Sequence, residues 1–86
     1  MTFYKLISRK DYGTIVRAAD ARNQAEFDKK DRKWYRSGVM LLYFAPYDDN
    51  PYYDLYEEIS EDEARKAVEK YGVDLYEPAV YKFDDK

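Results

Sequence analysis

Residues 60–72 read Ser-Glu-Asp-Glu-Ala-Arg-Lys-Ala-Val-Glu-Lys-Tyr-Gly, and this stretch predicts a helix that packs against a sheet. Ser60 and Glu63 form a capping box at its start, and Gly72 can close its far end in a left-handed conformation. Its apolar residues fall at i, i+3, i+4 and i+7 and therefore share one stripe: Ala64, Ala67, Val68 and Tyr71. A helix with one apolar stripe needs an apolar surface to cover, and the strand patterns around it supply one.

Upstream of this helix the chain shows strand patterns and one further helix pattern. We expect strands at residues 3–8 and 14–18, which are rich in aromatic and β-branched residues and are separated by a turn. Asp20 suits the cap of a helix over residues 21–30, although the apolar face of that helix is thin. Residues 33–44 carry apolar side chains on both alternating faces, which is typical of a central strand.

The remaining segments complete an α+β fold. Pro46 and residues 48–51 predict a loop, residues 52–59 a fourth strand with one wet face, and residues 79–83 an edge strand. The predicted order is strand, strand, helix, strand, strand, helix, strand. We therefore expect one α+β domain over residues 1–86, with a mostly antiparallel sheet, two helices packed on one face of it, and a frayed end at residues 83–86.

Composition favours a cytoplasmic protein. Of the 86 residues, 38% are charged and 45% are hydrophobic, with eleven tyrosines among the latter. No apolar run approaches the roughly 18 residues that a membrane span needs, and the first residues do not resemble a secretory signal, so we expect no membrane association. The chain has no cysteine, which excludes disulfides and thiolate metal sites.

Charge is distributed unevenly along the chain. Residues 1–40 carry ten Lys or Arg and five Asp or Glu, whereas residues 41–86 carry five and thirteen. Two interpretations remain open. The halves either neutralise each other in the fold or present a basic and an acidic face to partners.

Catalytic and cofactor signatures are missing from the sequence. There is no His and no Cys, and Ser60 is already committed to a helix cap. The three glycines are too far apart for a phosphate-binding loop. Counting from Asp48, a calcium loop would need a glycine where Tyr53 stands and a carboxylate where Ile59 stands. We expect no enzyme activity, no cofactor and no dedicated metal site.

The segment from Tyr47 to Glu58 is the strongest functional signal, because it interleaves four tyrosines with five carboxylates and contains no basic residue. Such a segment either forms an ordinary solvated edge strand and loop or makes a protein interface with aromatic anchors, Tyr52 and Tyr56, and a charged rim. The candidate protein-binding residues are Tyr47, Asp48, Asp49, Tyr52, Asp54, Tyr56, Glu57, Glu58, Glu61 and Asp62.

The leading hypothesis is a small acidic binding protein whose partner has a basic surface. Carboxylates in such number can imitate a phosphate track, so we expect an inhibitor of a nucleic-acid-handling enzyme, by analogy of size and charge with small acidic proteins of phages and mobile elements.

Two other functions stay open. Residues 29–36 combine five basic residues with two aromatic ones, as single-stranded nucleic-acid sites do. A nucleic-acid-binding module would use Lys29, Lys30, Arg32, Lys33, Tyr35 and Arg36, whereas we expect Trp34 to face the core. The third possibility is an accessory domain in a larger assembly.

Overall fold

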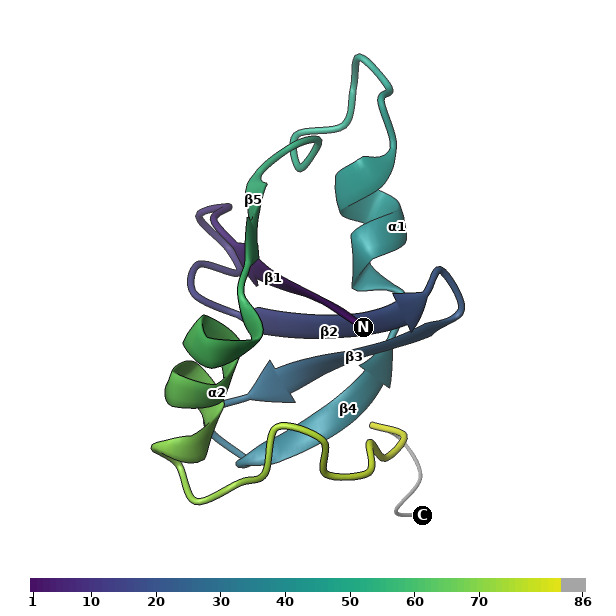
Figure 1. Cartoon of the computed structure of the whole chain (residues 1–86). Helices are drawn as coiled ribbons and strands as arrows, with labels where there is room; N and C mark the ends of the chain where they lie inside the picture. The colour runs from purple at the N-terminus through teal and green to yellow at the C-terminus, as the bar shows by residue number, and fades with distance from the viewer. Residues whose placement is uncertain (83–86) are drawn as a thin grey trace.

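The computed structural model describes residues 1–82, and its elements run in this order (Figure 1): β1 (Thr2–Leu6), β2 (Ile15–Asp20), β3 (Asn23–Asp28), β4 (Lys33–Ser37), α1 (Val39–Phe44), β5 (Tyr56–Ile59) and α2 (Glu61–Glu69). The five strands form one antiparallel sheet in the order β4-β3-β2-β1-β5. The predicted α+β class, with an antiparallel sheet and two helices, is confirmed. The expected fraying of residues 83–86 lies outside the described residues.

The centre of the sheet is β2, which corresponds to the predicted strand at residues 14–18. Its first two residues, Ile15 and Val16, point to opposite faces, and both are buried. Strand β1 pairs with β2 on one side and with β5 on the other. The predicted central strand was instead residues 33–44, and that assignment is wrong because β4 lies at the edge of the sheet.

Residues 21–30 were predicted as a helix and instead form β3 and its flanking turns. The Asp20 carboxylate accepts hydrogen bonds from the backbone N–H groups of Arg22 (2.8 Å) and Asn23 (3.0 Å), the same bonds that a helix cap would make, but here they close a hairpin turn. Ala25 and Phe27 are buried on one face of β3. Their spacing of two residues is the period of a strand, and this apolar period favours a strand over the predicted helix.

Residues 33–44 divide into β4 and α1 at Gly38. The break is stabilised by side chains that bond the first free N–H groups of α1. Ser37 Oγ accepts from the Val39 N–H (3.0 Å), and the buried Gln24 Oε1 accepts from the Met40 N–H (3.0 Å). Because Gln24 lies on β3, the sheet itself helps to fix the start of α1.

The second half of the chain follows the prediction more closely. Strand β5 is shorter than the predicted residues 52–59, since Asp54 adopts a left-handed φ of 64° in a turn that precedes it. Helix α2 is confirmed. Ser60 Oγ accepts from the Glu63 N–H at 3.1 Å, and Gly72 has a φ of 80°, which favours glycine.

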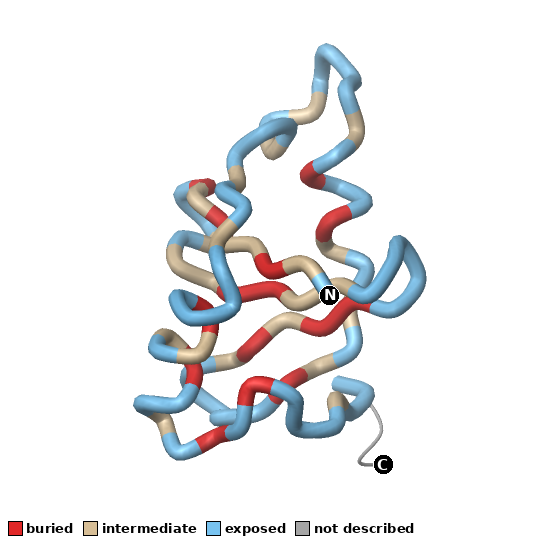
Figure 2. Tube along the Cα trace, viewed as in Figure 1, coloured by how far each residue is buried: buried red, intermediate tan, exposed pale blue. Residues whose placement is uncertain are grey.

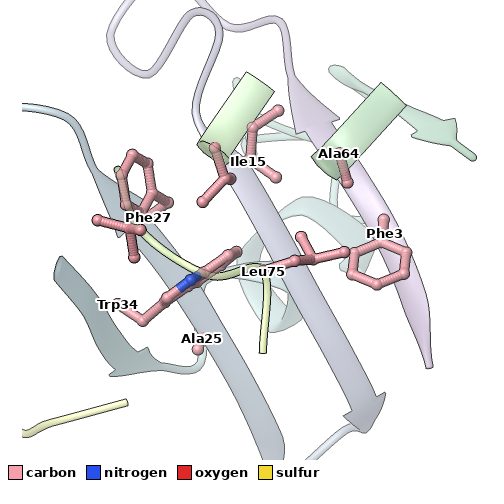
Figure 3. Close-up of a cluster of buried hydrophobic side chains, with 9 residues drawn as sticks. Phe3, Ile15, Ala25, Phe27, Trp34, Ala64 and Leu75 are labelled. Carbon is pink, nitrogen blue, oxygen red and sulfur yellow. The ribbon is translucent and has the colours of Figure 1, made fainter. Parts of the chain in front are cut away.

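The two helices cover opposite faces of the sheet, not one face as predicted. On the α2 face, Phe3, Ile15 and Trp34 pack with Ala64 and Val68 of the helix (Figure 3). A smaller cluster of buried residues forms on the α1 face: Leu6, Val16, Met40 and Tyr43. The arrangement follows from the alternation of buried residues along β1 and β2, which are covered from both sides (Figure 2).

The segment after α2 closes the larger core. The Arg17 guanidinium stacks on the Trp34 ring at 4.4 Å and donates to the carbonyls of Leu75 (2.7 Å) and Glu77 (2.6 Å). The tail then bridges β4 in parallel through Val80, so it covers that edge of the sheet with a single bridge in place of a full strand. No helix within residues 1–82 is long and apolar enough to cross a membrane.

Candidate functional site

Direct ion pairs between the basic and the acidic half are missing among residues 1–82. The two ion pairs found there both belong to Arg65 of α2, which contacts Glu61 and Glu69 at 2.8 Å each. Even Lys5 and Glu57, cross-strand neighbours on β1 and β5, do not form one. Within residues 1–82 the two halves therefore do not neutralise each other through direct ion pairs.

Residues 45–55, which we call the acidic loop, fold back onto α1. Asn50 holds the loop there: its Nδ2 donates to the Leu42 carbonyl (2.7 Å) and the Ala45 carbonyl (2.8 Å), and its Oδ1 accepts from the Tyr52 N–H (3.0 Å). The Asp54 N–H also donates to the carbonyl of Tyr43 in α1. The loop thus supplies hydrogen-bond donors to carbonyls at the end of α1. Its carboxylates therefore lie on a segment that is held against the helix.

The two predicted anchors pack against α1 and are only partly exposed. The ring of Tyr52 lies 5.6 Å from the ring of the buried Tyr43, and the ring of Tyr56 lies 5.5 Å from Tyr4 and 5.3 Å from Phe44. Both side chains border the smaller core. Their first contribution is therefore to the packing of the loop and of β5, and the exposed aromatic surface consists of other rings.

Other apolar side chains, on the acidic loop and on α1, are the exposed ones. Tyr47 is 69% exposed and Tyr53 48%, and α1 adds Leu41 and Leu42 at 55% and 46%. A groove of about 480 Å³ runs between α1 and the loop, lined by Leu41, Leu42, Ala45, Tyr47, Asp49, Asn50, Pro51 and Tyr52. The groove is lined mostly by apolar side chains and by one carboxylate, that of Asp49, which suits a partner that offers an apolar side chain beside a cation.

The predicted acidic residues fall into two groups. Asp48, Asp49 and Asp54 are exposed on the acidic loop, at the top of the molecule in Figure 1. Glu61 and Asp62 lie beyond the other end of β5, in the first turn of α2, and the Arg65 guanidinium lowers the pKa of Glu61 by hydrogen bonding to it. Of these acidic residues, Asp49 is the one that lines the groove.

Glu57 and Glu58 lie between these groups, exposed on β5. Within residues 1–82, β5 pairs only with β1 and is therefore an edge strand. Exposed charged residues such as these two glutamates are common on solvated edge strands, where they discourage pairing with another strand.

The basic residues at 29–36 do not share one surface. Lys29, Lys30 and Arg32 are exposed at the turn between β3 and β4, whereas β4 alternates its side chains between the two faces of the sheet. The sequence expectation that Trp34 faces the core is confirmed, since it is 1% exposed. Tyr35 and Lys33 point to the α1 face of the sheet, and Arg36, on the other face, lies over Tyr81 at 5.2 Å.

One buried polar cluster has the residue types of a catalytic site. Tyr43 Oη is 2.5 Å from Ser8 Oγ and donates to the Asp11 carboxylate at 2.8 Å. Burial raises the pKa of Tyr43 to about 12, so the phenol stays protonated and cannot act as a base near neutral pH. The cluster ties the turn between β1 and β2 to α1. Among the described residues no group of three or more Asp or Glu side chains converges as a metal site would require.

Sequence reasoning missed Leu41, Leu42, Asn50 and Tyr53. The signal for the leucines was the run of six apolar residues in α1. A helix that is covered on one side only must expose some residues of such a run. Comparison with protein-family models, with curated proteins and with solved structures finds no match to this chain.

Proposed function

We propose that this domain is a non-enzymatic binding protein that engages a basic protein surface through the acidic loop and the exposed face of α1. The observation that carries the proposal is the groove between α1 and the loop, where apolar side chains occur together with the Asp49 carboxylate, which forms no ion pair among residues 1–82. Interfaces with aromatic anchors and a charged rim bind in this manner.

The anchors of this interface are Tyr47, Tyr53, Leu41 and Leu42. Their exposure is high for apolar residues of a small domain, and tyrosine supplies contact area at a low cost in conformational entropy. Asn50 supports them, because a tethered loop loses less freedom on binding than a loose one.

The rim consists of Asp48, Asp49 and Asp54, which steer a basic partner toward the groove. Carboxylates spaced along a loop also imitate the phosphates of a nucleic-acid strand. The partner class we infer is therefore a nucleic-acid-handling enzyme whose basic groove the acidic loop occupies.

A site-specific photo-crosslinker in place of Tyr47 tests the proposal in a cell lysate. We expect one discrete protein adduct that excess untagged parent protein removes. The variant Asp48→Lys/Asp49→Lys as competitor should remove it poorly, because it repels a basic surface. The same crosslinker in place of the exposed Arg22, on the turn between β2 and β3, should not give this adduct.

The identified partner then allows a kinetic test. Charge reversal at Asp48 and Asp49 should slow association and weaken its dependence on salt, whereas Tyr47→Ala should mainly speed dissociation. The partner should also lose its own bound oligonucleotide when this protein is added. An adduct that the charge-reversed competitor removes as well as the parent does would refute the proposed interface.

A further inference from the structure

A second groove, of about 470 Å³, lies on the α2 side of the sheet and has four lysines among its ten lining residues. We call it the lysine groove. Its charged lining residues are Lys5, Lys29, Lys66, Lys70 and Glu63. The lysines come from β1, from the turn between β3 and β4, from α2 and from the C-cap position of α2, and none of them forms an ion pair among residues 1–82.

The shape of the groove depends on Gly13 in the turn between β1 and β2. Gly13 has a φ of 87°, and the Lys29 ammonium lies 3.1 Å from the place where a Cβ on Gly13 would stand. A larger residue would push this lysine aside. The turn also presents Tyr12, which is 67% exposed, lines the same groove and has the Lys5 ammonium 5.6 Å from its ring centre.

The concentration of like charge works against folding. Lys66 lies on α2 and Lys70 is the C-cap residue four positions later, so both lie on the same side of the helix, where like charges repel each other. Glu63 is the one carboxylate among the lining residues, so four lysines face one acid. A bound polyanion would relieve this repulsion by taking the place of the missing carboxylates.

Positive charge also continues beyond the groove. The exposed residues Lys30 and Arg32 follow Lys29 in the turn between β3 and β4, on either side of the exposed Asp31, whereas Lys33 points to the α1 face. An extended row of cations fits a chain of phosphates better than a single phosphate ion. The exposed ring of Tyr12 adds a face on which a base can stack, and cations beside stacking rings are the combination that single-stranded nucleic acids use.

We propose that the lysine groove binds single-stranded nucleic acid, with the lysines contacting successive phosphates and Tyr12 stacking on one base. This site shares no lining residue with the groove between α1 and the acidic loop. It reaches the end of β5 that leads into α2, whereas the acidic loop precedes the other end (Figure 1). It differs from a site formed by residues 29–36 alone, since three of its four lysines, Lys5, Lys66 and Lys70, come from outside that segment.

Fluorescence anisotropy with a labelled oligothymidylate of about 12 nucleotides tests the site. Four phosphate contacts predict that log K falls with log salt concentration with a slope of about −3. The variant Lys66→Gln/Lys70→Gln should bind about tenfold more weakly and reduce the slope to about −1.5. Its matched control is Arg22→Gln/Lys82→Gln, which removes the same charge from exposed positions outside the groove and should change binding less than about twofold.

Tyr12→Ala separates base stacking from simple attraction between charges. It should weaken oligothymidylate binding about tenfold and leave the binding of inorganic polyphosphate unchanged. Thermal melts followed by circular dichroism should show all three variants folded, because every substituted side chain is exposed. Equal losses in the groove variant and its control would overturn the site. A Tyr12→Ala variant that binds oligothymidylate as the parent does would overturn single-stranded nucleic acid as the ligand.

Discussion

Replacing Asn50 tests whether one amide holds the acidic loop on α1. Asn50→Ala removes two hydrogen bonds to helix carbonyls and one from the Tyr52 N–H. Each such bond contributes about 0.5–1.5 kcal/mol net, and water can replace the more exposed ones. We expect a loss of about 2 kcal/mol in the free energy of unfolding, which for a domain of this size lowers Tm by roughly 8–16 °C.

Asn50→Asp makes the test sharper because it keeps the shape and the acceptor but removes the donor. At neutral pH the new carboxylate faces the Leu42 and Ala45 carbonyls at the negative end of α1, so the variant should be at least as unstable as Asn50→Ala. Below about pH 4 the protonated carboxyl can donate again, and part of the lost stability should return.

Asp49→Ala is the control for both variants, since Asp49 is exposed in the same loop and makes no hydrogen bond among residues 1–82. It should change stability by less than about 0.5 kcal/mol. Urea unfolding and amide exchange of residues 45–54 give the readouts. If Asn50→Ala melts together with Asp49→Ala, the loop does not depend on the amide and this reasoning is refuted.

Three further predictions concern the cores. Arg17→Ala removes the cation over Trp34 and two bonds to the tail, and should cost about 2–3 kcal/mol with a red shift of tryptophan fluorescence; an unshifted spectrum would contradict it. Val68→Ala, at a fully buried site, should cost about 1–3 kcal/mol in urea unfolding, and a neutral effect would mean that α2 is not packed there. Because burial raises the pKa of Tyr43 to about 12, from about 10 when unfolded, the stability contributed by its neutral phenol is complete below about pH 10 and is lost toward pH 12. Tyr43→Phe should therefore flatten the decline of stability over that range, and a decline as steep as the parent's would exclude the effect.

Short-range sequence patterns correctly predicted the elements that depend on neighbouring residues only. The capping serine and the closing glycine of α2 are nearest-neighbour effects, and both occur as expected at Ser60 and Gly72. The hairpin of β1 and β2 needs only apolar strands and a turn. Asp20 shows the limit of such signals, because the same carboxylate geometry serves a helix cap and a hairpin turn.

Contacts between distant residues explain the errors. The start of α1 is stabilised by Gln24, sixteen residues upstream, and the loop after α1 by Asn50, eight residues downstream of the Leu42 carbonyl that it bonds. Neither bond can be recognised from the sequence of residues 33–44 alone, because the apolar residues on both alternating faces of that segment favour a strand. Once α1 is a helix, the exposure of Leu41 follows, and so does the groove of the candidate site.

The sheet explains why so small a domain can carry two separate surfaces. Because β1 and β2 bury residues on both faces, each helix packs on its own cluster and the two helices never share a core. The acidic loop is held on α1 by Asn50 and by the bond from the Asp54 N–H to the Tyr43 carbonyl, whereas the lysine groove is lined by β1, by α2 and by the turns after β1 and β3. The Tyr43 phenol, which donates to Asp11 in the turn after β1, is the buried link between the two. Substitutions at exposed residues of one surface should therefore act independently of those at the other, in the way that distant sites do. Buried substitutions in β2 should disturb both surfaces, since Ile15 and Val16 are adjacent residues that serve opposite cores.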